Sequence, residues 1–143
     1  MAKTTFSIGG VHPDDAKISR GCAIEVLPLP QTVYISMAQH LGAPAKPVVA
    51  VGDSVKAGQV IAEPGGFISA FVHSSVSGTV KSIAPRKDIA GNNVMHVEIA
   101  VEGDEWAEGI DLSDTIVSEI PQDRAAILDK IKACGVVGLG GAT

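Results

Sequence analysis

Residues 44–85 read PAKPVVAVGDSVKAGQVIAEPGGFISAFVHSSVSGTVKSIAP, and they carry the strongest signal for the fold. Short runs rich in Val, Ile and Ala alternate there with turn-forming groups at Gly52-Asp53, Pro64-Gly65-Gly66 and Ser77-Gly78. Small residues of this kind reverse the chain tightly, and apolar residues at alternate positions fill a narrow interior. The spacing therefore predicts several short strands that form a small barrel or sandwich.

Strands are expected between these turns and in the flanking segments. Those within the stretch cover residues 47–51, 59–63, 67–72 and 79–84, and the flanking ones cover residues 33–37 and 94–101. Gly52 and Gly78 are expected at turn positions with positive φ, a conformation that glycine adopts without steric cost. Replacing either glycine with valine is predicted to destabilise the fold by about 1 kcal/mol or more.

The two ends of the chain differ in character from this centre. Residues 1–23 are rich in turn formers and are expected to be an extended arm with loops. Pro28 and Pro30 exclude an interior strand in the apolar segment that follows. The predicted divisions are an arm with edge strands (1–43), a β core (44–102) and a C-terminal part (103–143).

The C-terminal part begins as an acidic linker and continues as a predicted helix. In PQDRAAILDKIKACG (121–135), Pro121 suits the first helical position and Asp123 the first turn, while Lys130 and Lys132 suit the last turn. Gly135 is the expected stop. The chain then reads VVGLGGAT, and such a segment directly after a helix predicts the opening of a further, truncated domain of a longer protein.

Composition and charge narrow the class of protein. The 143 residues are 45% hydrophobic but include only five aromatic residues, so the core is expected to consist of Val, Ile, Leu and Ala. With 11 Lys and Arg against 16 Asp and Glu, the net charge is −5, which argues against nucleic acid as the main partner. No apolar run approaches the roughly 18 residues of a membrane span, and no secretory signal is visible.

Residues able to carry chemistry are scattered along the chain. The histidines have no metal-binding spacing and are expected to be structural: His12, His40, His73 and His96. Among them only His96 falls in a firmly predicted strand. Cys22 and Cys134 lie far apart without a C-x-x-C motif, which predicts two reduced thiols. No catalytic residue and no metal ligand is predicted.

The turn pattern resembles the barrel-sandwich hybrid fold of biotinyl and lipoyl carrier domains. Such carriers present a modified lysine on an exposed hairpin, but the corresponding residues here are Pro64-Gly65-Gly66-Phe67. A swinging-arm role is therefore disfavoured. The alternative that stays open is a stand-alone carrier or phosphocarrier domain of biotinyl-like fold, which would act as a group-transfer enzyme.

The closing GVVGLGGAT permits two interpretations. Closely spaced glycines can expose N–H groups to an anion. However, no Lys-Ser/Thr pair follows Gly140-Gly141, as a P-loop requires, and a helix rather than a strand precedes the motif. The other interpretation is a helix end followed by a linker.

A longer resemblance connects these segments. GGVHPDDAK (9–17), IEVLPLP (24–30), QHLGAPAKPVVAVGDSVKAGQ (39–59) and VSGTVK (76–81) resemble, in the same order, the C subunit of the Rnf electron transport complex. The closing GVVGLGGA resembles the opening of that family's flavin- and NADH-binding domain, which is similar to the flavoprotein subunit of respiratory complex I. Residues 103–120 carry little of the resemblance.

The resemblance implies a peripheral subunit on the cytoplasmic face of the inner or plasma membrane. Its complex passes electrons between NADH and ferredoxin and couples this transfer to ion translocation. The full-length subunit is expected to bind FMN, NADH and two 4Fe-4S clusters. Its expected partners are the other subunits of the membrane complex, with NADH and ferredoxin reached through the rest of the chain.

The resemblance also implies which part of the subunit this chain supplies. The family's cluster ligands belong to C-x-x-C-x-x-C-x-x-x-C-P runs, which this sequence lacks. The family's glycine loop continues into Gly-Phe-Pro-Thr, whereas this chain stops at Ala142-Thr143. Gly138, Gly140, Gly141 and Ala142 are carried over as FMN contacts in the intact protein only. The 143-residue segment alone is predicted to be a non-catalytic docking and support module without a cofactor.

Overall fold

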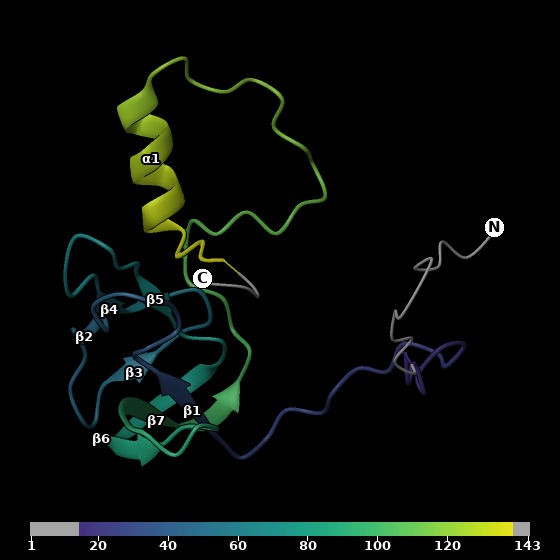
Figure 1. Cartoon of the computed structure of the whole chain (residues 1–143), viewed down its shortest axis with the longest axis vertical. Coiled ribbons are helices and arrows are strands. Elements are labelled where there is room, and N and C mark those ends of the chain that lie inside the picture. Colours follow the sequence, from purple (N-terminus) through teal and green to yellow (C-terminus); the bar gives the residue numbers. More distant parts are fainter. Residues whose placement is uncertain (1–14, 139–143) are drawn as a thin grey trace, which may run out of the picture.

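The computed structural model describes residues 15–138, which form mainly β-structure followed by a helix (Figure 1). In chain order the elements are β1 (Thr32–Ser36), β2 (Lys46–Pro47), β3 (Ser54–Val55), β4 (Val60–Glu63), β5 (Val72–His73), β6 (Ser77–Lys87), β7 (Asn93–Gly103) and α1 (Arg124–Ala133). The prediction of a mainly β chain with a C-terminal helix is confirmed.

The strands form two antiparallel sheets. One sheet has the order β1-β7-β6-β3, and the other has the order β2-β4-β5. The hairpin β6–β7 forms the centre of the larger sheet, with pairing that runs from Ser77↔Gly103 to Lys87↔Asn93. Two register shifts, between Ser77 and Gly78 and between Val80 and Ser82, interrupt this pairing. Irregularities of this kind increase the local twist and help a short sheet to curl.

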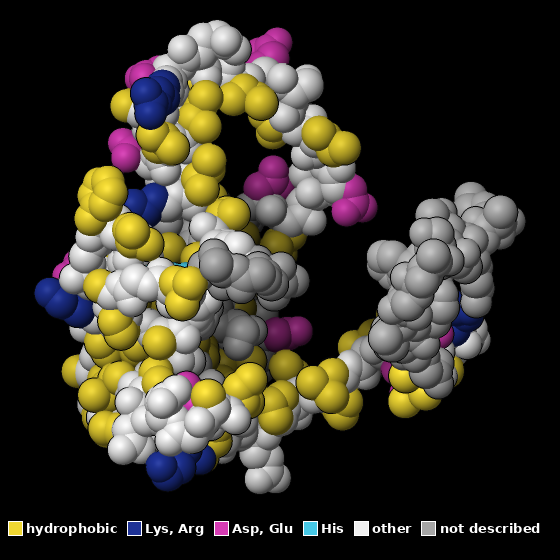
Figure 2. Space-filling view, in the orientation of Figure 1, with side chains coloured by type: hydrophobic (Ala, Val, Ile, Leu, Met, Phe, Trp, Pro, Cys, Tyr) yellow, Lys and Arg dark blue, Asp and Glu magenta, His cyan; other side chains and the backbone are white. Residues whose placement is uncertain are grey.

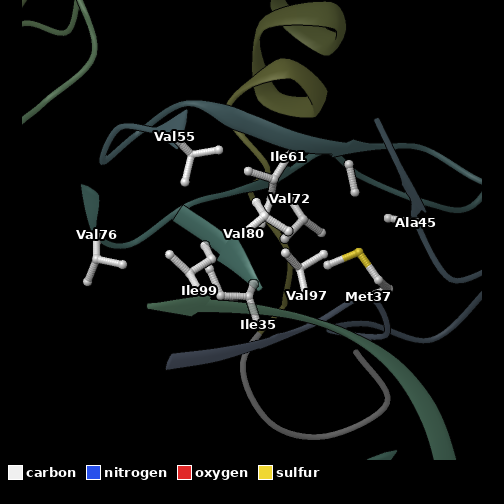
Figure 3. Close-up of a cluster of buried hydrophobic side chains, with 11 residues drawn as sticks. Ile35, Met37, Ala45, Val55, Ile61, Val72, Val76, Val80, Val97 and Ile99 are labelled. Atoms are coloured by element: carbon white, nitrogen blue, oxygen red, sulfur yellow. The ribbon is translucent and has the colours of Figure 1, made fainter. Parts of the chain in front are cut away.

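The space between the sheets is filled by aliphatic side chains. Val80, Val97 and Ile99 from the larger sheet and Ile61 from β4 are fully buried, and Met37 lies at one end of the cluster (Figure 3). Full burial of a side chain of this size stabilises a protein by about 1.5–3 kcal/mol. Among the described residues no aromatic side chain belongs to this core, in agreement with the composition.

Two glycines that were predicted to occupy turns have different roles. Gly52 has a φ of 97° in the turn before β3, as predicted. Gly78 lies inside β6 opposite Val101, so the predicted turn with positive φ at this position is wrong. A Cβ on Gly78 would collide with the carbonyl oxygen of Ala100 on β7. Glycine is needed there because two backbones approach closely.

Two predicted strands are shorter than expected. Of the residues predicted at 47–51 only Pro47 belongs to a strand (β2), and of those predicted at 67–72 only Val72 does (β5). Phe67 is almost completely exposed. The residues before β5 do not pair with a strand because they pack against the chain near Ala43, which contributes a backbone N–H to the carbonyl oxygen of Ile68.

Helix α1 begins later than predicted. The carboxylate of Asp123 accepts a hydrogen bond from the N–H of Ala125 at 2.9 Å, which makes Asp123 the N-cap rather than a first-turn residue. Pro121 therefore lies outside the helix. The predicted end is confirmed, because Gly135 follows the last turn with a φ of 65°.

Candidate functional site

The connection between β4 and β5 contains Pro64-Gly65-Gly66-Phe67, the residues that the resemblance to carrier domains sets against the lysine hairpin. A Cβ on Gly65 would collide with the carbonyl oxygen of Pro44, and a Cβ on Gly66 would lie 2.9 Å from the Cβ of Ala43. The connection therefore packs tightly against the chain that precedes β2. This close approach explains why glycines, rather than a residue with a long side chain, follow Pro64.

Hydrogen bonds hold this connection in place, and we call them the loop clamp. The hydroxyl of Ser69 accepts a hydrogen bond from the N–H of Gly65 at 3.0 Å and donates one to the carbonyl oxygen of Ala43 at 2.8 Å. The N–H of Ala43 donates to the carbonyl oxygen of Ile68 at 3.0 Å. Two segments far apart in the sequence are thus joined without any regular strand pairing.

His40 adds a further bond to the loop clamp. Its Nε2 lies 3.2 Å from the backbone N–H of Ala70, so Nε2 must accept and carries no proton. Its Nδ1 lies 3.0 Å from the carbonyl oxygen of Leu41 and can then donate. Both ring nitrogens have backbone partners in this tautomer, and the structural role predicted for His40 follows from these contacts.

A cleft of about 500 Å³ lies between the clamped loop and helix α1. Its apolar lining comes from Leu41 and Ile68 on one side and from Leu128 and Ile131 on the other. Its charged lining residue is Lys132 in the last turn of α1. A surface of this kind can bind apolar groups, but the hydroxyl of Ser69 and the imidazole of His40 both have backbone partners already.

The end of helix α1 directs the chain to the rim of this cleft. A Cβ on Gly135 would lie 2.6 Å from the carbonyl oxygen of Phe71 and 3.1 Å from Nδ1 of His73, so only glycine fits between the helix and β5. Gly138 lines the cleft. The other predicted flavin contacts, Gly140, Gly141 and Ala142, lie outside the described residues.

The histidines in the described part of the chain lie on different elements: His40 is bound in the loop clamp, and His73 and His96 lie in strands. His96 lies on β7, as predicted, and its Nδ1 is 2.8 Å from the carbonyl oxygen of Val94. His73 also lies in a strand, β5, which the sequence did not predict. These strands belong to different sheets, and His12 lies outside the described residues. Within residues 15–138, no group of three His, Cys, Asp or Glu side chains is placed to hold a metal ion.

The shifted pKa values lie outside the cleft. A hydrogen bond from Lys56 to the carboxylate of Glu105 at 2.7 Å raises the pKa of Lys56, and the charge of Glu105 adds to this effect. The backbone N–H of Asn92 lowers the pKa of Asp88 in the turn between β6 and β7. The backbone N–H of Ser113 similarly lowers the pKa of Asp111. These shifts arise from contacts at the surface and do not indicate a proton-transfer site.

The two cysteines form no disulfide with each other, in line with the predicted thiols, and both are exposed. Cys134 is the C-cap of helix α1, and Cys22 lies in the segment before β1. In the described part of the chain, no helix is both long and apolar enough to cross a membrane.

Comparison with known proteins gives a consistent result. Residues 5–105 match the family model of the RnfC barrel sandwich hybrid domain. The chain is 41% identical to the C subunit of the proton-translocating ferredoxin:NAD(+) oxidoreductase complex of Clostridium ljungdahlii, a match that covers 94% of this chain and 29% of the relative. It is 38% identical to the C subunit of the Na(+)-translocating ferredoxin:NAD(+) oxidoreductase complex of Acetobacterium woodii, over 94% of this chain and 30% of the relative.

A third relative extends the range of organisms. The C subunit of the ion-translocating oxidoreductase complex of Pseudomonas aeruginosa is 37% identical, over 96% of this chain and 18% of the relative. The chain thus spans less than a third of the length of each of these curated relatives. The two-sheet sandwich, its loop without an attachment lysine and the match over residues 5–105 agree, and the chain belongs to the RnfC barrel sandwich hybrid domain family.

Proposed function

We propose that this chain is the non-catalytic N-terminal domain of the NADH-side subunit of an Rnf-type membrane complex. The complex would couple electron transfer between NADH and ferredoxin to ion translocation. The main support is the identity of 41% to a relative whose name describes a proton-translocating ferredoxin:NAD(+) oxidoreductase complex, over 94% of this chain. In such a complex the domain would support the electron-carrying part of the subunit and dock it against other subunits on the cytoplasmic face of the membrane.

The clamped loop supports a non-catalytic role. A carrier domain needs a flexible, exposed tip, whereas the loop between β4 and β5 is hydrogen-bonded to the chain before β2 through Ser69 and Ala70, and its Gly65 donates to the Ser69 hydroxyl. Its serine and the neighbouring histidine make bonds to the backbone, so neither is free to act as a nucleophile or a base. These residues stabilise a rigid platform beside helix α1.

The described residues do not fit the cofactors expected for the whole subunit. Of the four residues expected to contact FMN, only Gly138 lies in the described part of the chain, where it lines the cleft beside α1. The two exposed cysteines are too few to ligate a 4Fe-4S cluster. FMN, NADH and the two clusters would therefore be held by the rest of the subunit, where Gly138, Gly140, Gly141 and Ala142 would contribute to the FMN site only in the intact protein.

The proposal is tested by titrating the purified 143-residue chain with FMN and with NADH. Absorbance and flavin fluorescence are expected to stay those of the free compounds, and the purified chain is expected to be colourless. A matched titration of the full-length relative from Clostridium ljungdahlii serves as the positive control. Tight flavin binding by the 143-residue chain would contradict the non-catalytic assignment.

A further inference from the structure

The segment before β1 exposes apolar side chains that a folded protein normally buries. Ile24 is 99% exposed, Val26 is 93% exposed and Leu27 is 84% exposed. Residues 24–30, which we call the apolar arm, extend away from the sandwich (Figure 1), and yellow side chains line the corresponding part of Figure 2. A run of exposed apolar residues of this kind marks a surface that binds another protein surface.

The apolar arm is stiff before it binds. Pro28 and Pro30 fix their own φ angles, and each restricts the preceding leucine, Leu27 or Leu29, to an extended conformation. A segment that is already extended loses less conformational entropy on binding than a flexible tail does. The prolines also lack an N–H, so the arm is suited to contacts through its side chains rather than to strand addition.

A second exposed apolar segment lies in the connection between β7 and α1. The linker loop (residues 104–123) extends to the right of α1 in Figure 1, the side to which the apolar arm also points. Within it, Ile116 is 89% exposed and Val117 is 72% exposed. Acidic side chains accompany these residues in the linker loop: Asp104, Glu108, Asp111, Asp114 and Glu119, besides Glu105, which pairs with Lys56, and Asp123, which caps α1. A partner between the arm and the loop would present an apolar face with Lys or Arg at its edge.

We propose that the apolar arm and the linker loop pack against the part of the subunit that, in the longer relatives, lies outside the region matched by this chain. The family match begins at residue 5, so the arm falls within the domain that defines the family. The match to nearly the whole chain covers only 29% of the Clostridium ljungdahlii relative and 18% of the Pseudomonas aeruginosa relative. Most of each relative is therefore available as a covalently linked partner.

Covalent linkage favours this occupant over a separate chain. A tethered partner is present at a high effective concentration, so a small contact made by an extended arm is sufficient to hold it. A separate protein or a second copy of the chain would have to bind through the same small contact from dilute solution. This inference rests on the proposed function, because it takes the longer relatives as the model of the intact subunit.

The test compares two single-cysteine variants, Val26→Cys in the apolar arm and Ile89→Cys in the turn between β6 and β7, after replacement of Cys22 and Cys134 by serine. Both native side chains are fully or almost fully exposed. Each variant is made in the 143-residue chain and in a chimaera in which this chain replaces the matching region of the Clostridium ljungdahlii relative. Maleimide labelling rates are measured by mass spectrometry of the labelled peptides.

In the isolated chain, the two cysteines are expected to react at similar rates. In the chimaera, the cysteine at position 26 is expected to react about tenfold more slowly, because labelling then requires the arm to detach, while the cysteine at position 89 keeps its rate. Equal rates at both positions in the chimaera would overturn the proposal. Protection in the isolated chain that grows with protein concentration would also overturn it, because the partner would then be a second copy.

A second measurement keeps the test independent of the folding of the chimaera. Cysteines are introduced into the full-length Clostridium ljungdahlii relative at the positions that align with 26 and 89. The cysteine aligned with position 26 is expected to be labelled more slowly than the other, and equal labelling rates would overturn the proposal. The flavin titration distinguishes this failure from failure of the proposed function. If the full-length protein binds FMN while the arm cysteine is labelled at its full rate, only the proposed contact of the arm is contradicted. Flavin binding by the isolated chain would instead contradict the proposed function.

Discussion

At the scale of single residues, positions 52 and 78 both require glycine, but for different physical reasons. Gly52 has a positive φ and open space around its Cα, so its requirement is a backbone conformation. Gly78 has no such φ, but a side chain there would enter the backbone of β7 at Ala100. The first requirement is local and is visible in a Gly-Asp pair. The second depends on a strand that follows many residues later.

Alanine substitutions are expected to separate these two requirements. Gly78→Ala should lower the free energy of unfolding by about 2–3 kcal/mol or more, because the strands of the β6–β7 hairpin must move apart. Gly52→Ala should cost about 1–2 kcal/mol through the backbone alone. Gly103→Ala is the matched control on β7, since its new Cβ would meet only the hydroxyl of Ser77 at 3.3 Å. Urea denaturation measures all three, and equal losses at Gly78 and Gly103 would contradict this account.

Among the elements of the fold, the loop clamp replaces a strand pair. The loop between β4 and β5 and the chain before β2 are held by the hydroxyl of Ser69 and by His40. The alternation of apolar and polar residues cannot predict such a contact, because its hydrogen bonds connect side chains to the backbone of a segment that is distant in the sequence. This is why the sequence predicted a strand over 67–72, where the structure has a hydrogen-bonded loop and β5 begins only at Val72.

Removing the Ser69 hydroxyl should loosen the clamp. Ser69→Ala is expected to lower the free energy of unfolding by about 1–2 kcal/mol, since two hydrogen bonds are lost and their backbone partners are partly buried. Amide hydrogen exchange at the N–H of Gly65, which donates to this hydroxyl, should accelerate. Ser75→Ala, at an exposed serine two residues after β5, is the control and should change neither quantity. Unchanged exchange at Gly65 in Ser69→Ala would contradict the clamp.

Taken as a whole, the molecule combines a carrier-like sandwich with surfaces that a free carrier does not need. The sandwich buries its aliphatic core fully, whereas the arm, the linker loop and α1 keep apolar side chains exposed. The described part of α1 contains no buried residue. A fully buried core together with exposed apolar surfaces is expected of a domain that packs within a larger assembly.

Intact mass spectrometry tests this view against the carrier alternative. After expression with biotin ligase or lipoate ligase, or incubation with a phosphohistidine donor, the chain is expected to keep its unmodified mass. The reason is that Gly65 and Gly66, which correspond to the carrier's lysine hairpin by resemblance, offer no side chain to modify and pack against Ala43 and Pro44. An authentic biotin carrier domain in the same cells is the positive control. A stoichiometric mass increase of this chain would establish a carrier function.

Much of the fold was predictable because its signals are local. The turn at Gly52, the strands that became β1, β4, β6 and β7, and the stop of the helix at Gly135 depend on glycine, proline and apolar alternation within a few residues. The start of the helix was misplaced by three residues from Pro121 to Arg124, because a carboxylate at Asp123 served as a cap instead of a first-turn charge. The identity of the cap depends on backbone geometry that sequence pattern alone does not specify.

The two-sheet sandwich with an aliphatic core, the missing attachment lysine and the resemblance to the Rnf C subunit all follow from the order of residues along the chain. The folded arrangement was needed to show that Gly78 touches a neighbouring strand, that Ser69 and His40 clamp a loop, and that the apolar arm has no surface of this domain to cover it. The physical reason is the range of the interactions. Turns and periodic strands are set by neighbours along the chain, whereas clamps, close backbone contacts and uncovered surfaces depend on segments that meet only after folding.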